Sequence, residues 1–220
     1  MNILYVSSSP RGSESYSNRV AERVVRELRE GHPDAHVVLR DLANHPLPHI
    51  DEDFVAATRG AGPRNERQAA LLRQSDSVVD ELLAADVLVI AVPMINFGVP
   101  STLKAWFDTI ARPGRTFSYS EAGPKGLVTG KRVIIVSATG GIYSAGQGAA
   151  LDFQLPWLRS MLGFLGMTDV EVIRIEGTAF GAEAAEKALQ RAHAQAHEIV
   201  EARRALVVEL EQRRRAAAAA

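Results

Sequence analysis

Apolar residues in this chain gather in short runs separated by longer mixed segments. Residues Val87 to Val92 form an apolar run with no polar position in it, which is typical of a strand buried on both faces of a parallel sheet. Comparable short runs occur at residues 2–6, 35–39, 133–137 and 170–175. The pattern therefore predicts five strands, with 87–92 at the centre of the sheet.

Between these runs, apolar residues recur every three or four positions. In segment 18–30, Val20, Val24 and Leu28 follow this spacing with arginine and glutamate between them, so one helical face is predicted to pack on the sheet. The same reasoning predicts helices at 51–61, 63–85, 101–111, 151–165 and from 182 to beyond 210. The predicted buried stripe of the 63–85 helix consists of Leu71, Leu72, Val78, Val79, Leu82 and Leu83.

The alternation of strands and helices predicts an α/β fold. Right-handed crossovers would give a doubly wound five-stranded parallel sheet with helices on both faces. We expect residues 1–212 to form a single domain and residues 213–220, R-R-R-A-A-A-A-A, to form a frayed helical tail with nothing to bury. Phe117, Tyr119 and the following Gly123-Pro124 predict a small hairpin or lid outside the core.

The charge and composition narrow the partners that we expect. The chain has 220 residues, 46% of them hydrophobic, a formal net charge of -1 and no cysteine. A balanced charge gives no electrostatic footprint for nucleic acid or an anionic membrane, and the lack of cysteine excludes disulfides and thiolate chemistry. The first residues lack the pattern of a signal peptide and no run is long enough to span a membrane. We therefore expect a cytoplasmic protein with small-molecule partners.

The first candidate for binding is the loop from Ser7 to Ser17, which follows the first predicted strand. It is rich in hydroxyl groups and precedes a helix, and unpaired N–H groups at a helix start favour an anion. The loop matches neither the P-loop pattern nor G-x-G-x-x-G, so a monophosphate fits better than a nucleoside triphosphate or a dinucleotide. The alternative is a serine-rich turn that only caps the helix.

Two further loops are expected at the same edge of the sheet. Met94, Ile95, Asn96 and Phe97 follow the central strand, where ligands bind in open α/β sheets. Gly140 and Gly141 follow the strand at 133–137, and glycines there would let backbone N–H groups approach a flat polar ring. The spacing around Ser144 does not fit G-x-S-x-G, which disfavours a hydrolase.

The histidines do not predict a metal site. His193 and His197 share a helical face at i and i+4, but no further ligand stands near them in the sequence. We expect both to be solvated, and the same holds for His45 and His49.

Four motifs together resemble one family. They are S-S-S-P-R-G-S-E-S-Y-S-N, P-M-I-N-F-G-V-P-S-T-L-K-A-W-F-D, F-S-Y-S-E-A-G-P-K-G-L-V-T-G-K and G-F-L-G-M-T-D-V. In these stretches the chain is similar to the FMN-dependent NADH-azoreductases, also called NADH:quinone oxidoreductases, of the flavodoxin-like fold. The resemblance runs from residue 2 to about residue 200.

The resemblance implies a role for each loop in binding FMN. The phosphate and ribityl chain would be held by Ser9, Ser15, Tyr16 and Ser17. The isoalloxazine ring would lie along Met94, Ile95, Asn96 and Phe97, and its polar edge would be closed by Ala138, Thr139, Gly140 and Gly141. It further implies a homodimer in which the partner completes each site, with Tyr119 and Phe164 reaching the substrate. For Phe164 the alternative is core packing.

The implied activity is reduction of quinones and azo compounds by NADH in a two-electron ping-pong cycle, with no catalytic side chain. Two alternatives stay open: a flavodoxin-type carrier of single electrons, and a reductase of free flavin or another electron-poor ring. The chain departs from the family at Ala138-Thr139, where Ser-Arg is frequent, and at Ile95, where tyrosine is frequent. These departures keep the backbone donors but remove a guanidinium and a phenol, so they bear on the flavin potential and the substrate preference.

Overall fold

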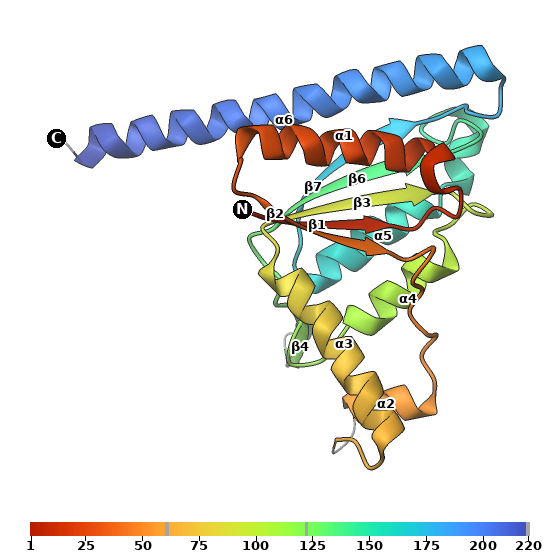
Figure 1. Ribbon diagram of the computed structural model, residues 1–220, viewed down its shortest axis with the longest axis vertical. Coiled ribbons are helices and arrows are strands. Elements are labelled where there is room, and N and C mark those ends of the chain that lie inside the picture. Colours follow the sequence, from red (N-terminus) through yellow and green to blue (C-terminus); the bar gives the residue numbers. More distant parts are fainter. Residues whose placement is uncertain (60–61, 122, 219–220) are drawn as a thin grey trace.

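The sheet consists of five parallel strands, as the sequence predicts. The computed structural model describes residues 1–59, 62–121 and 123–218. The strands run in the order β2-β1-β3-β6-β7, with β3 at the centre (Figure 1). Their bounds are β1 (Asn2–Ser7), β2 (His36–Asp41), β3 (Val87–Pro93), β6 (Arg132–Ala138) and β7 (Asp169–Ile175). Because the order reverses between β1 and β3, the carboxyl ends of these two strands form a topological switch point.

Helices cover both faces of the sheet, which confirms the doubly wound arrangement. One face carries α1 (Tyr16–Gly31) and α6 (Ala182–Ala218), and the other carries α3 (Glu66–Ala84), α4 (Ser101–Ile110) and α5 (Gln154–Leu165) (Figure 1). In β3, Val87, Val89 and Ala91 belong to the first apolar layer, and Leu88, Ile90 and Val92 belong to the second. Burial on both sides explains why this strand shows no polar alternation.

The buried stripe predicted for α3 is partly wrong. Val78, Val79 and Leu82 are buried, but Leu83 is 38% exposed, and Leu71 and Leu72 are half-buried. Leu71 and Leu72 belong to the first turns of α3, which extend past the sheet and pack on α2 (Glu52–Arg59), whereas Leu83 lies in the last turn. The predicted end of the α2 helix at residue 61 lies outside the described residues.

The segment after α4 forms the predicted hairpin. Strand β4 (Phe117–Ser120) pairs antiparallel with β5 (Gly123–Gly126). The hairpin is attached to the carboxyl end of α5, where the N–H of Val128 donates to the carbonyl of Leu165 at 2.9 Å. Residue 122, within the predicted lid, lies outside the described residues.

Two helix boundaries differ from their predicted places. A 3-10 turn at Gly146–Leu151 precedes α5, so this helix begins at Gln154 instead of near Leu151. Helix α6 runs for 37 residues and extends past the body of the molecule (Figure 1). The backbone of 213–218 continues this helix, and residues 219 and 220 of the predicted tail lie outside the described part of the chain.

The α1–α6 contact changes the expected setting of two histidines. His193 is half-buried, and burial, with Arg23 nearby, lowers the pKa of its imidazole. His197 Nδ1 lies 3.4 Å from Glu27 Oε2. The expectation that both are solvated is therefore wrong for His193, because α1 covers it.

None of the helices in the described ranges is both long and apolar enough to cross a membrane.

Candidate cofactor site

Three loops meet at the switch point and enclose a pocket of about 310 Å³. This volume lies within the roughly 300–1,000 Å³ range typical of small-molecule sites. Eight residues named from the sequence line it: Ser9, Ser15, Tyr16, Met94, Ile95, Ala138, Thr139 and Gly140. Four more lining residues were not predicted: Arg11, Pro93, Thr178 and Ala179.

The serine loop is built as an anion site at the start of α1. Ser15 caps this 16-residue helix, because its Oγ accepts from the N–H of Asn18 at 3.2 Å and shares a hydrogen bond with Ser17 Oγ at 3.0 Å. The side chain of Asn18 fixes the loop from below, accepting from Ser7 Oγ and donating to the carbonyl of Gly12. The helix start and the hydroxyls of Ser9 and Ser15 therefore face one pocket, where a phosphate is favoured.

Arg11 adds a cation to this loop. Its guanidinium carbon lies 5.8 Å from the centre of the Tyr16 ring, and the residue lines the pocket. Charge-assisted hydrogen bonds to phosphate are stronger than neutral ones, so a guanidinium here strengthens the anion site. The sequence held a signal for it, since Arg11 is the one basic residue between Ser7 and Ser17.

The loop after β3 is a strained tight turn. Ile95 and Gly98 exchange two backbone hydrogen bonds of 3.0 Å, and the two residues between them have positive φ, 47° for Asn96 and 70° for Phe97. Two successive positive φ values are typical of a type I′ turn, which asparagine tolerates and phenylalanine does not favour. A non-glycine residue in this region costs about 1–3 kcal/mol, and such strain collects at binding sites.

The loop after β6 is held open by the segment that follows β7. The carbonyl of Thr139 accepts from the N–H and Oγ1 of Thr178, and the carbonyl of Gly140 accepts from the N–H of Ala179 at 3.0 Å. Within the described residues, the N–H groups of Gly140 and Gly141 have no acceptor. These two donors are therefore available to a ligand.

Some of the residues named from the sequence do not line the pocket. Ser17 is fully buried behind Ser15, and Asn96, Phe97 and Gly141 flank the cavity in the turn and the glycine loop. The structure does not bring Tyr119 and Phe164 to this site in the same chain. Both rings pack on Phe117, with centroid distances of 5.3 Å for Tyr119 and 4.6 Å for Phe164.

The placement of these two aromatic residues follows from the topology. Helix α5 runs antiparallel to the strands, so Phe164 near its end lies toward the amino edge of the sheet, and the hairpin with Tyr119 is attached there (Figure 1). The ring of Phe164 contributes to the apolar layer under α5. Within one chain, Phe164 therefore packs against the core, which is the alternative to a substrate contact.

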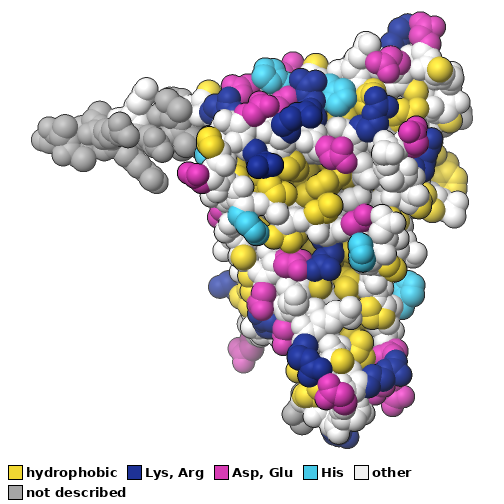
Figure 2. All heavy atoms as spheres, in the orientation of Figure 1, with side chains coloured by type: hydrophobic (Ala, Val, Ile, Leu, Met, Phe, Trp, Pro, Cys, Tyr) yellow, Lys and Arg dark blue, Asp and Glu magenta, His cyan; other side chains and the backbone are white. Residues whose placement is uncertain are grey.

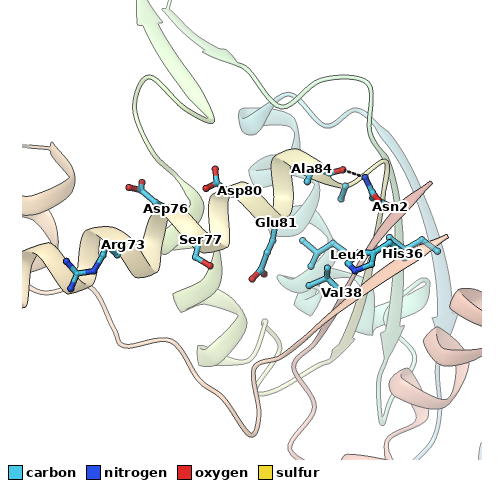
Figure 3. Close-up of a pocket in the computed structure, with 12 residues that line it drawn as sticks. Asn2, Leu4, His36, Val38, Arg73, Asp76, Ser77, Asp80, Glu81 and Ala84 are labelled. Carbon is cyan, nitrogen blue, oxygen red and sulfur yellow. Dashed lines mark hydrogen bonds between the residues drawn. The ribbon is translucent and has the colours of Figure 1, made fainter. Parts of the chain in front are cut away.

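Another hollow, of about 600 Å³, lies between α3 and the amino halves of β1 and β2 (Figure 3). Glu81 of α3 points toward the side of Leu4 and Val38, whereas Asp76 and Asp80 point away from these strand residues. These three carboxylates form ion pairs with Arg40, Arg112 and Arg115, and the hollow lies at the amino end of the strands, away from the switch point. Among the described residues there is also no cluster of three or more metal-binding side chains.

Comparison with known proteins agrees with the pocket at the switch point. The family described as the flavodoxin-like fold matches residues 1–200. An FMN-dependent NADH:quinone oxidoreductase from Mesorhizobium japonicum is 50% identical over 206 residues, covering 93% of this chain and 98% of the relative. This chain belongs to the family of FMN-dependent NADH:quinone oxidoreductases. The fold class and the family expected from the sequence are thereby confirmed.

Solved structures of azoreductases are similar in fold to this chain. An azoreductase from Bacillus anthracis matches with a TM-score of 0.85 at 29% identity, covering 91% of this chain and 98% of that one. The azoreductase AzrA matches with a TM-score of 0.84, also at 29% identity. Each match covers 91% of this chain and at least 98% of the solved structure.

The residues of this family member fit FMN. A phosphate needs donors and a cation, which the start of α1, the serine hydroxyls and Arg11 provide. A flat ring with a polar edge needs an apolar floor and donors at its rim, which Met94 and Ile95 and the N–H groups of the glycine loop provide.

Proposed function

We propose that this protein uses NADH to reduce quinones and aromatic azo compounds on a bound FMN. The observation that carries the proposal is the convergence of the serine loop, the strained turn and the glycine loop on one pocket at the switch point. A relative that is 50% identical over 206 residues is named for FMN, NADH and quinone, which supports the same cofactor, donor and acceptor class.

The proposed roles follow the three loops. Ser9, Ser15 and Tyr16, joined by Arg11, hold the phosphate and the ribityl chain, and Ser17 supports them through its hydrogen bond to Ser15. The ring lies along Met94, Ile95, Asn96 and Phe97, and its polar edge faces Ala138, Thr139, Gly140 and Gly141. Residues 1–212 would act as one FMN-binding domain.

Bound FMN supplies the redox chemistry, in which NADH gives up a hydride and leaves as NAD⁺ before the quinone takes two electrons and two protons at the same place. The protein contributes binding, orientation and fixed donors. None of the residues that line the pocket is a histidine or a carboxylate, so we assign no catalytic side chain, and protons come from solvent. An azo compound needs two such cycles to yield two amines.

We further propose a homodimer in which the partner completes each site. Tyr119 is 73% exposed at the tip of the hairpin, unusually open for an aromatic side chain, and it lies away from the pocket of its own chain. A second copy would bring this ring to the mouth of the neighbouring pocket, where it could stack on a flat substrate. Phe164, which packs beside the hairpin on Phe117, would reach the substrate from the same side.

Mixing two inactive variants is expected to restore activity if the site is shared. A chain with Ser15→Asp would lack flavin but keep Tyr119, and a chain with Tyr119→Ala would keep flavin but lack the partner ring. In the mixed dimer one site has both, so quinone reduction should rise to several times the sum of the separate variants. Activity that stays at that sum would mean that Tyr119 does not act across a subunit boundary.

The charge distribution argues against an electron carrier. A carrier that docks on protein partners gains from a one-sign surface, whereas this chain has a net charge of -1, and acidic and basic side chains are interspersed over the face in Figure 2. The same pattern gives no footprint for nucleic acid. We propose the cytoplasm, which supplies NADH, as its location.

Steady-state kinetics test the proposed function. FMN-loaded protein should oxidise NADH only when a quinone is present, and double-reciprocal plots at several quinone concentrations should be parallel, because the two substrates use one place in turn. Turnover with free FMN that exceeds turnover with benzoquinone would favour the flavin reductase instead. One-electron reduction without NADH oxidation would favour the carrier.

A further inference from the structure

The start of α5 contacts the turn after β3 and the end of β6, the strand that leads into the glycine loop. Gln154, the first residue of this helix, is fully buried. Its Oε1 accepts from Ser137 Oγ, at the end of β6, at 2.6 Å, and its Nε2 donates to the carbonyl of Gly98 over 3.5 Å. Next to it, the N–H of Phe153 donates to the carbonyl of Phe97 at 3.1 Å.

These contacts fix the strained turn from behind. Phe97 has a φ of 70°, a conformation that persists only where neighbouring groups hold it. Two carbonyls of the turn, those of Phe97 and Gly98, are bound by Phe153 and Gln154. With its carbonyls held on the side of α5, the turn directs the N–H groups of Asn96 and Phe97 elsewhere, and within the described residues neither has an acceptor.

We propose that Gln154 is a positioning residue for the flavin. With Ser137 as its anchor, it sets the 95–98 turn in the conformation that presents the free N–H groups of Asn96 and Phe97 to the FMN ring. The inference rests on the proposed function, since it takes the ring to lie along this turn. Gln154 itself lies outside the pocket wall and acts through the turn.

Further polar contacts hold the start of α5, and with it Gln154, in place. The carboxylate of Asp152 accepts from the N–H groups of Gln154 and Leu155 at 3.1 and 3.0 Å, so it caps α5. Nη1 of Arg174, a residue of β7, lies 3.4 Å from Oδ2 of Asp152, and this ion pair connects the start of α5 to the sheet. The amide of Gln154 is therefore presented from a rigid support, as accurate positioning requires.

The alternative is that the buried pair of Gln154 and Ser137 only stabilises the packing of α5. Both accounts expect a loss of stability when the pair is broken, because a buried polar group then loses its partner. The two accounts differ in what they predict for the binding and the potential of FMN. Only a positioning role changes the FMN dissociation constant and the midpoint potential of bound FMN, because these depend on where the donors of the turn lie.

The test compares Gln154→Met and Ser137→Ala with a matched control. Ser75→Ala removes an equally buried serine far from the pocket, whose Oγ donates to the carbonyl of Thr109 at 2.9 Å and accepts from Arg112 Nη1 at 2.6 Å. The readouts are the melting temperature of the apoprotein, the FMN dissociation constant from fluorescence titration, and the midpoint potential of bound FMN. Ser137→Ala is the milder change, so it keeps the test open if Gln154→Met does not fold.

All three variants should melt at a lower temperature than the wild type. FMN binding should weaken by about tenfold in Gln154→Met and by a smaller factor in Ser137→Ala, with a shifted potential in both. Ser75→Ala should keep the FMN dissociation constant and the midpoint potential of the wild type. If the pair variants bind FMN as the wild type does at an unchanged potential, the positioning role is overturned and the proposed function stands. A wild-type protein that binds no FMN overturns both.

Discussion

Ser15→Asp is expected to weaken FMN binding by at least about 100-fold, because a carboxylate beside a phosphate repels it by several kcal/mol in a partly buried site. Ser15 is only 2% exposed and lines the pocket at the start of α1. The change leaves the helix cap in place, since aspartate caps as well as serine does. The apoprotein should melt at the same temperature as the wild type or higher, because a negative charge is favoured at a helix start.

Two controls isolate the charge as the cause. Ser15→Asn introduces a cap of the same shape as aspartate without charge, so its FMN affinity should stay within about tenfold of the wild type. Riboflavin lacks the phosphate, and its binding should be nearly equal in the Asp and Asn variants. Fluorescence titration measures all four affinities. Equal FMN affinity of the two variants would show that the phosphate does not lie at Ser15.

Gly126→Ala is expected to lower the free energy of unfolding by about 3 kcal/mol, because the added carbon has no room. It would lie 2.2 Å from the nitrogen of Gly166 and 2.3 Å from the carbonyl carbon of Leu165, both of them backbone atoms. Gly126 ends β5, and Gly166, with a φ of 102°, ends α5. The change would therefore separate the hairpin from α5.

Gly163→Ala is the matched control for this clash. Gly163 lies three residues earlier, within α5, and an added carbon there meets nothing within 4 Å. Alanine is favoured over glycine inside a helix, so this variant should gain about 0.5–1 kcal/mol. Urea unfolding measures both changes. An equally stable Gly126→Ala variant would show that the hairpin does not pack as closely as the structure has it.

The sheet and the loops were predictable because each rests on a local pattern. The unbroken apolar run at 87–92 required cover on both faces, and the structure supplies it with two layers of helices. The serine loop and the glycine pair follow strands directly, and parallel strands bring their carboxyl ends to one edge. Sequence order alone therefore placed these loops together.

The residues that were missed depend on contacts between distant segments. Thr178 and Ala179 reach the pocket because they pair with Thr139 and Gly140, almost 40 residues earlier. Gln154 reads as an ordinary polar helix residue, and only the folded chain brings it to Ser137. The positive φ of Phe97 is equally invisible, because phenylalanine gives no signal for a left-handed turn. Leu83 is exposed although it follows the buried Leu82 in the last turn of α3, and the apolar spacing alone does not separate the two.

An anaerobic titration of the purified FMN-loaded protein, followed in the visible spectrum, tests the central claim most directly. We expect one equivalent of NADH to bleach the flavin band and one equivalent of a benzoquinone to restore it, with the same stoichiometry on a second round. A protein that takes up no FMN, or whose bound FMN is not bleached by NADH, would contradict the account and leave the family resemblance to describe the fold alone.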